Sequence, residues 1–236
     1  MFTDQASYDI RCEWGPTGVE ALAGSFTYII VDVLSFSTCV AIATQRRSFI
    51  IPCAEKGLAA QEMARRHDAL LAAPRGEGYS LSPDSWQSAP PDLRVVLPSP
   101  NGAVLSLKAA GHGHVLAGCL RNRTAVAAHA AALGGPIAII PAGERWKDGT
   151  LRPSLEDLVG AGAIIALLPG KRSPEAMMAE SAWKSVEHDL SSTIRLCSSG
   201  RELIERGFAE DLEQAAKLDE DKVAPQLIDG MFRAVD

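Results

Sequence analysis

Short apolar runs alternate with amphipathic stretches over residues 1–170 of the chain. The apolar runs have the length and composition of buried strands, and the stretches between them repeat with a helical period. We predict strands at 26–32, 48–51, 69–72, 94–98, 114–117 and 137–141, and helices at 38–45, 55–66, 102–110, 124–133 and 155–167. This alternation predicts an α/β protein in which helices cover both faces of a largely parallel or mixed sheet, a three-layer α/β/α fold.

The pattern changes in the C-terminal third. Ser173 followed by Pro174 is a typical helix start. From there to residue 218 we predict mainly helix, with a polar break at residues 190–200. Since no internal repeat or long linker divides the chain, we expect one α/β domain over residues 1–236; two lobes of about 1–95 and 96–236 that share an active-site cleft are the alternative.

Residues 73–92 are the longest stretch without periodicity in the α/β part of the chain, with four Pro, two Gly and four Ser. A segment of this kind in a compact enzyme forms either a functional loop or a plain surface excursion. The sequence leaves both alternatives open.

Composition narrows the class of protein. Hydrophobic residues make up 47% and charged residues 22%, and no apolar run is long enough to span a membrane. The N-terminus lacks the basic start and apolar run of a secretory signal, so we expect a cytoplasmic protein. The five cysteines never form a C-x-x-C spacing, which predicts buried thiols rather than disulfides or a zinc site. A net charge of −6 argues against a nucleic-acid partner, so an anionic substrate would need a local cluster of arginines.

One carboxylate lies at the carboxyl end of a predicted strand, where the active sites of α/β enzymes are found. The strand at 26–32 ends in Asp32, and Ser37 and Thr38 open the following helix. Ligands of open parallel sheets bind beyond the carboxyl ends of the strands, where helix N-termini present unpaired N–H groups to anions. An aspartate at this place also serves simply to begin a turn. Asp32 is therefore a candidate catalytic residue, with a structural turn as the alternative.

Two more acids begin the helix at 155–167. Ser154 and Asp157 have the spacing of a capping box, and acids favour the positive end of a helix. Because adjacent side chains point about 100° apart on a helix, we expect Glu156 and Asp157 to serve different purposes, one as a cap and the other toward a site.

Several common motifs are missing. The sequence contains no phosphate-binding P-loop, no dinucleotide-binding glycine turn and no nucleophile elbow. His112 and His114 have a spacing that could ligate a metal, but their context is more typical of a helix end and the entry to a strand.

Taken together, these stretches resemble the magnesium-dependent 2-phosphosulfolactate phosphatases of coenzyme M biosynthesis. The segments that carry the resemblance follow the family's order across about 200 residues: Val31-Asp32-Val33-Leu34 with Ser37-Thr38, Asn101-Gly102, Gly118 through Asn122, Ala142-Gly143, Ser154-Leu155-Glu156-Asp157 with Ala161-Gly162, Ser199-Gly200-Arg201-Glu202-Leu203, Gly207, Asp211, Asp219 and Val223-Ala224-Pro225. The resemblance implies a layered α/β/α fold and the hydrolysis of a phosphate monoester of a small 2-hydroxy acid, with Mg²⁺ required.

The resemblance also implies roles for individual residues. Asp32 would be a Mg²⁺ ligand or, as the alternative, a nucleophile that accepts the phosphoryl group, and Glu156 or Asp157 would be a second metal-side carboxylate. Oxygens of the phosphorylated substrate would be bound by Ser37, Thr38, Arg75, Asn101, Gly102, Asn122 and Arg145.

The chain departs from the family pattern at the presumed site. Where the family signature has arginine after V-D-V-L, this chain has Ser35, which cannot replace the charge of a guanidinium. Phe36 replaces a small residue, the family's G-E-R becomes Ala73-Pro74-Arg75, and T-T-N-G-T becomes residues 99–103 with Pro100. The altered positions are those expected to contact the ligand.

Two functional classes therefore stay open. The first is a Mg²⁺-dependent phosphatase of altered specificity, in which Arg75, Arg121, Arg123 or Arg145 supplies the charge missing at position 35. Arg145 is the best candidate from the sequence because it lies just beyond the Ala142-Gly143 turn. The second is a non-catalytic descendant that binds an anionic metabolite or a protein partner. The sequence does not decide between a monomer and a homo-oligomer.

Overall fold

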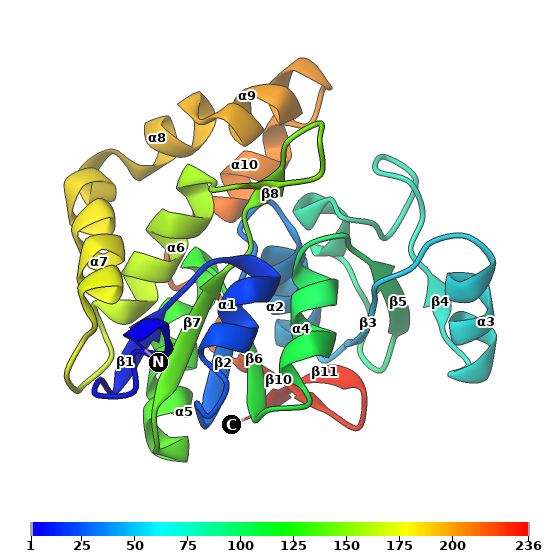
Figure 1. Ribbon diagram of the computed structural model, residues 1–236. Helices are drawn as coiled ribbons and strands as arrows, with labels where there is room; N and C mark the ends of the chain where they lie inside the picture. Colours follow the sequence, from blue (N-terminus) through cyan, green and yellow to red (C-terminus); the bar gives the residue numbers. More distant parts are fainter. Residues whose placement is uncertain (1, 236) are drawn as a thin grey trace.

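The strands of the protein form one large mixed sheet and one small hairpin in a computed structural model that describes residues 2–235 (Figure 1). They are β1 (Ile10–Cys12), β2 (Thr27–Val31), β3 (Phe49–Cys53), β4 (Leu70–Leu71), β5 (Arg94–Pro98), β6 (His114–Gly118), β7 (Ile137–Pro141), β8 (Glu144–Arg145), β9 (Leu151–Arg152), β10 (Ala224–Ile228) and β11 (Met231–Val235). The large sheet has nine strands in the order β1-β7-β2-β6-β10-β11-β3-β5-β4, and β8 and β9 pair separately.

Two blocks of parallel strands meet at an antiparallel hairpin. β1, β7, β2 and β6 form one block, and β3, β5 and β4 form the other. The hairpin of β10 and β11 lies between them and pairs with β6 and β3. The predicted α/β fold with a mixed sheet is confirmed, while the sequence pattern did not reveal β1, β10 or β11.

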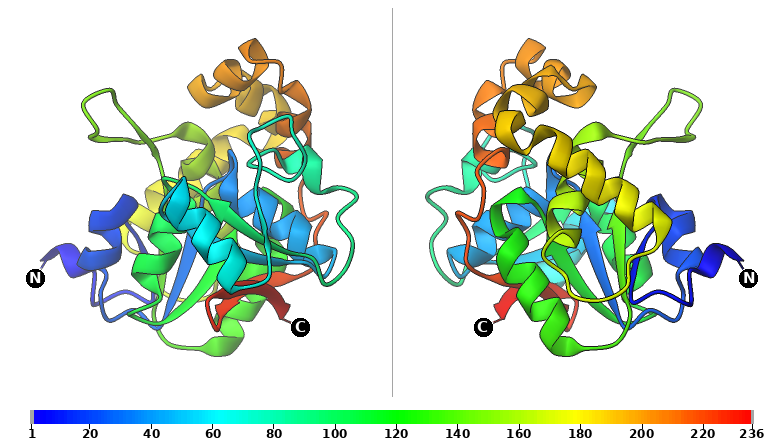
Figure 2. Two further views of the ribbon diagram at one scale, coloured as in Figure 1. Left: turned by 90° about the vertical axis from the view of Figure 1, so that its right-hand side faces the viewer. Right: turned by 90° about the vertical axis from the view of Figure 1, so that its left-hand side faces the viewer.

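Helices cover both faces of the sheet (Figures 1 and 2). They are α1 (Gly15–Ala21), α2 (Phe36–Gln45), α3 (Leu58–Arg66), α4 (Gly102–Ala109), α5 (Arg123–Leu133), α6 (Leu155–Ile165), α7 (Pro174–Val186), α8 (Leu190–Leu196), α9 (Ser198–Glu205) and α10 (Ala209–Ala215), with short 3₁₀ turns at 2–4, 83–86, 120–122 and 187–189. Since side chains alternate along a strand, Tyr28 and Ile30 of β2 pack with α1, α2 and α4, and Ile29 and Val31 pack with α5, α6 and α7.

The predicted polar break at residues 190–200 is wrong, because α8 fills its first part and α9 begins at Ser198. Each of these short helices buries few apolar side chains; those of α8 are Leu190 and Ile194. Their helical structure is therefore decided by packing, which a hydrophobic pattern does not show. The predicted start of α7 is confirmed, since the Ser173 side chain accepts a hydrogen bond from the N–H of Ala176 at 3.1 Å.

The last helices and the loop at 73–92 come together at one end of the sheet. α9 lies close to the hairpin of β8 and β9, where Arg152 Nη2 donates to the Ser199 hydroxyl at 3.3 Å. The loop is packed: Trp86 is fully buried, and its indole N–H donates to the carbonyl of Ser80 at 2.8 Å. Asp211 of α10 accepts hydrogen bonds from Ser82 and from the backbone N–H of Asp84. The loop is therefore anchored to the C-terminal helices.

Other sequence expectations have direct counterparts. All five cysteines are buried and unpaired, as predicted. His114 begins β6 after the end of α4, which confirms the interpretation of this segment as a strand entry. Within residues 2–235, no helix is long and apolar enough to cross a membrane. The division into one domain or two lobes stays a prediction.

Candidate active site

A cavity of about 150 Å³ lies beyond the carboxyl end of β2. Its walls come from the β2–α2 and β5–α4 connections, the loop at 73–92, the start of β8, and α9 with the residue that follows it. We call it the acidic cavity because three carboxylates line it. Its charged and amide side chains are Asp32, Arg75, Asn101, Glu144, Glu202 and Arg206.

Asp32 is held in place by the first residues of two helices. The backbone N–H of Phe36 donates to Oδ1 at 3.0 Å, and that of Gly102 donates to Oδ2 at 2.9 Å. Both donors are helix N-terminal groups without a partner inside their own helix. The Ser37 hydroxyl accepts from the N–H of Asp32 and donates to the carbonyl of Ile30, which fixes the turn. The carboxylate is therefore oriented before any ligand binds.

Position 102 requires glycine because the start of α4 lies very close to Phe36 of α2. A Cβ atom there would lie 2.4 Å from Cδ1 of Phe36, a distance that carbon atoms do not tolerate. The absence of a side chain lets α4 approach α2 closely enough for its first N–H to reach Asp32. The Asn-Gly pair of the sequence therefore has a geometric reason.

The electrostatics of the cavity favour a cation. Burial, followed by the charge of Glu144, raises the pKa of Asp32 to about 7. Burial also raises the pKa of Glu144, although Asn101 Nδ2 donates to its Oε2 at 3.1 Å. Glu156 adds to both shifts. Clustered carboxylates that raise one another's pKa are stabilised by a bound positive charge.

The two adjacent acids of α6 have different surroundings, as the sequence predicted, but the predicted capping box does not form, because the Ser154 side chain accepts no hydrogen bond from the backbone of α6. Asp157 accepts hydrogen bonds from the N–H of Val33 at 2.8 Å, from the N–H of Gly143 at 2.9 Å and from the Ser154 hydroxyl at 2.8 Å. Its carboxylate thus ties the β2–α2 connection to the turn after β7. Burial, followed by the charge of Glu156, raises the pKa of Asp157 well above its usual value.

Glu156 is buried, and its charge acts on Asp32 and Glu144. Its side chain interacts with the thiol of Cys197, next to the start of α9. Neither Glu156 nor Asp157 is among the residues that line the acidic cavity. Glu156 acts on the cavity by its charge, and Asp157 by holding two of its loops.

Arg75 brings positive charge to the cavity. Its Nη2 donates to the Ser35 hydroxyl at 3.0 Å, and its Nη1 forms an ion pair with Asp211, whose side chain is 1% exposed. Ser35 in turn donates to the carbonyl of Leu81 in the loop at 73–92. The residue that stands at the arginine position of the family motif therefore contacts an arginine from another part of the chain.

Other predicted substrate-binding residues lie outside the lining of the cavity. The Thr38 hydroxyl donates to the carbonyl of Val33 at 2.7 Å. Asn122 is fully buried, accepts from the N–H of Cys119 and donates to the carbonyl of Ala117. Arg145 is exposed and donates to the carbonyl of Gly149 at 3.1 Å. Thr38 and Asn122 hold turns next to the site, and Arg145 does not line the cavity.

Two more arginines that the sequence offered as sources of charge are paired elsewhere. Arg121 is buried and forms an ion pair with Asp221 at 2.6 Å. Arg123 pairs with Asp219 at 2.9 Å. Neither arginine lines the acidic cavity. Their ion pairs with Asp221 and Asp219 fix the segment that follows α10.

Sequence reasoning missed Glu144, Glu202 and Arg206. Glu144 follows the Ala142-Gly143 turn and directly precedes Arg145. The motif therefore pointed to the correct segment, but we selected Arg145 instead of the adjacent Glu144. Glu202 lies inside the Ser199–Leu203 motif, and Arg206 follows it with the spacing of one helical turn. Those spacings are the signals that could have revealed both residues.

The donor set fits Mg²⁺. Among residues 2–235, no three or more His, Cys, Asp and Glu side chains are arranged to hold a metal by themselves. Mg²⁺ does not need such a cage, because it usually binds one or two carboxylates, several waters and substrate phosphate oxygens. Asp32 and Glu144 provide two carboxylates in one cavity, and burial is the main cause that raises the pKa of each.

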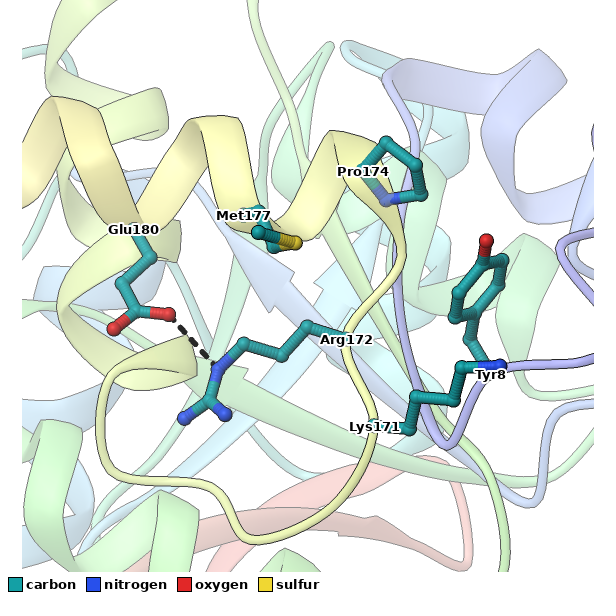
Figure 3. Close-up of a pocket in the computed structure, with 6 residues that line it drawn as sticks. All are labelled: Tyr8, Lys171, Arg172, Pro174, Met177 and Glu180. Atoms are coloured by element: carbon teal, nitrogen blue, oxygen red, sulfur yellow. Dashed lines mark ion pairs between the residues drawn. The ribbon is translucent and has the colours of Figure 1, made fainter.

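A second cavity, of about 520 Å³, has a different character (Figure 3). Arg172 Nε pairs with Glu180 at 2.9 Å, and its Nη2 donates to the carbonyls of Ile165 and Leu168 at the end of α6. Lys171 lies over the ring of Tyr8. The Arg172 guanidinium is thus occupied by contacts within the chain, and we assign no reaction to this cavity.

Comparison with known proteins finds one family, whose model covers the residues of the acidic cavity. The family model described as 2-phosphosulpholactate phosphatase matches residues 17–230. A probable 2-phosphosulfolactate phosphatase of Carboxydothermus hydrogenoformans is 31% identical over 84% of this chain and 84% of the relative. One of Caldanaerobacter subterraneus subsp. tengcongensis is 26% identical over 87% and 89%. The 2-phosphosulfolactate phosphatase of Methanothermobacter thermautotrophicus is 30% identical over 82% and 83%. The span matched by the family model contains every residue that lines the acidic cavity.

Proposed function

Because the chain belongs to the 2-phosphosulfolactate phosphatase family, as its motifs predicted, we propose that it is a Mg²⁺-dependent phosphatase that hydrolyses a phosphate monoester of a 2-hydroxy acid. The observation that carries this proposal is the convergence of Asp32 and Glu144 with Arg75 and Arg206 in one cavity at the carboxyl end of the sheet. The convergence favours a phosphatase over the non-catalytic binding protein that the sequence left open.

Asp32 and Glu144 are the residues that would hold Mg²⁺. When bound, Mg²⁺ neutralises charge on the phosphoryl oxygens and orients the attacking group. We assign Asp32 as a metal ligand, since two backbone N–H groups fix its carboxylate and each oxygen keeps a lone pair; acceptance of the phosphoryl group is the alternative role. Asn101 holds Glu144 in place, and the buried charge of Glu156 increases the affinity of the pair for a cation.

The arginines bind the anionic substrate. The Arg75 guanidinium keeps unused N–H donors after its bonds to Ser35 and Asp211, and a planar fork suits phosphate or carboxylate oxygens. Since the charge comes from Arg75 and Arg206 and not from position 35, we propose that the specificity differs from that of 2-phosphosulfolactate phosphatases that carry the motif arginine. The place in coenzyme M biosynthesis, the cytoplasmic location, the absence of a nucleic-acid partner and the oligomeric state remain predictions.

Phosphate release from 2-phosphosulfolactate and other phosphorylated 2-hydroxy acids, with Mg²⁺ and with EDTA, tests the proposal. We expect Asp32→Asn and Glu144→Gln to lower kcat/KM roughly a hundredfold, in the range seen when a group that stabilises transition-state charge is removed. Asp148→Asn, at an exposed carboxylate in the β8–β9 hairpin, is the matched control and should keep full activity. Unchanged turnover of Asp32→Asn, or equal rates in EDTA, would contradict the assignment.

A further inference from the structure

Another cavity, distinct from the one in Figure 3, adjoins the acidic cavity. This open cavity measures about 540 Å³, and it shares the residues Arg75, Leu81, Pro100 and Arg206 with the acidic cavity. We call it the distal cavity; its further lining includes Lys56, Ala60, Leu71 and Leu97. The shared residues show that the two cavities are neighbouring parts of one cleft, divided where the two arginines stand.

Charge divides the cleft into two halves. Asp32, Glu144 and Glu202 line the acidic cavity, whereas among the described residues no carboxylate lines the distal cavity. Lys56 is exposed and forms no ion pair within residues 2–235. Arg206 pairs with Glu202 at 3.2 Å, but both side chains are more than half exposed, so this pair holds the charge weakly. Arg75 is paired with the buried Asp211. Lys56 is therefore the cation of the distal cavity whose charge no carboxylate of the described chain neutralises.

The walls between these cations are apolar. Ala60, Leu71, Leu81 and Leu97 line the distal cavity together with several prolines. A cleft with apolar walls and a few charged groups is typical of a site for an organic ligand, with the charges fixing its orientation. The distal cavity is more than three times as large as the acidic cavity, so the short stem of sulfolactate would leave most of it unfilled.

We propose that the distal cavity binds the unphosphorylated end of the substrate, and that this end is an anionic group on an apolar stem longer than that of sulfolactate. The phosphate lies in the acidic cavity, Arg75 and Arg206 bind the carboxylate next to the ester, and Lys56 meets the far anion. This inference rests on the proposed phosphatase function and names its substrate class.

The test compares three phosphate monoesters, those of lactate, 2-hydroxyhexanoate and 2-hydroxyadipate, as substrates of the Mg²⁺-loaded protein. Lactate is short, hexanoate adds an apolar stem, and adipate adds a second anion at the end of that stem. We expect kcat/KM to rise in this order. Lys56→Glu should raise KM for the adipate ester about tenfold through charge reversal, and leave kcat and the lactate ester unchanged. Lys217→Glu, at another exposed lysine without an ion pair in the described chain, is the matched control.

Calorimetry with 2-hydroxyadipate and 2-hydroxyhexanoate measures the same preference without turnover. If all three esters are hydrolysed equally and Lys56→Glu changes neither KM nor binding, the distal assignment is overturned while the phosphatase stands. If no ester is hydrolysed but 2-hydroxyadipate binds the protein and loses affinity in Lys56→Glu, the phosphatase fails and the distal site is supported. If neither turnover nor binding is seen, both are overturned.

Discussion

We expect the free energy of unfolding of Asp32→Asn, measured without metal, to increase relative to that of the parent protein as the pH rises. The carboxyl of Asp32 has an ordinary pKa of 3.8 and, because of burial and then Glu144, a pKa of about 7 in the folded protein. Between these values the folded state keeps a proton that the unfolded state has lost. The free energy of unfolding therefore falls as the pH rises through this window, and the stabilising contribution is complete only below 3.8.

The size of the effect follows from the shift. One pKa unit corresponds to about 1.4 kcal/mol, so the raised pKa of Asp32 lowers the free energy of unfolding, relative to acid pH, by about 4 kcal/mol at pH 8 and by about 1–2 kcal/mol at pH 5. Asparagine removes this cost at both pH values, and it leaves one backbone N–H, of Phe36 or Gly102, without its acceptor, at about 1–3 kcal/mol. The second term does not depend on pH. The stability of Asp32→Asn relative to the parent should therefore increase by roughly 3 kcal/mol from pH 5 to pH 8.

Urea unfolding followed by tryptophan fluorescence measures this difference, since Trp86 and Trp183 are buried. The measurements are made in EDTA at pH 5 and pH 8. Asp219→Asn is the control: although burial opposes it, hydrogen bonds from Thr124 and Arg123 lower the pKa of Asp219, so this group is ionised at both pH values. Its relative stability should not change with pH. An equal result for Asp32→Asn at pH 5 and pH 8 would refute the reasoning.

Three further predictions concern the walls of the site. Arg75→Gln should lower kcat/KM by a factor on the order of a hundred, as for loss of a partly buried charged hydrogen-bond donor, whereas Arg145→Gln should leave it unchanged; steady-state kinetics on one phosphate ester compares them. Gly102→Ala should destabilise the protein by about 1–3 kcal/mol, because the added Cβ overlaps Phe36, and thermal unfolding measures the loss. Asn122→Ala should cost about 2 kcal/mol or more in urea unfolding, since two buried hydrogen bonds are lost, without changing KM.

The sequence pattern predicted those elements whose burial differs strongly from their surroundings. β2, β6 and β7 are buried along nearly their whole length, so they form clear apolar runs. β10 and β11 are mostly half-buried and carry Gln226 and Arg233, and β1 has three residues. Whether such a segment forms a strand depends on the strands with which it pairs, and the local hydrophobic pattern carries no information about them.

The sequence by itself determined the α/β class, the acid at the end of β2 and the family, because these depend on local pattern and motif order. Only the tertiary structure decided which charges meet at the site. Glu144 and Arg145 are neighbours on β8, and successive side chains of a strand point to opposite sides, so one lines the cavity and the other faces solvent. Arg75 reaches the cavity while paired with Asp211, 136 residues away along the chain. Contacts between such distant residues arise only when the chain is folded, and they select Arg75 as the arginine beside Ser35.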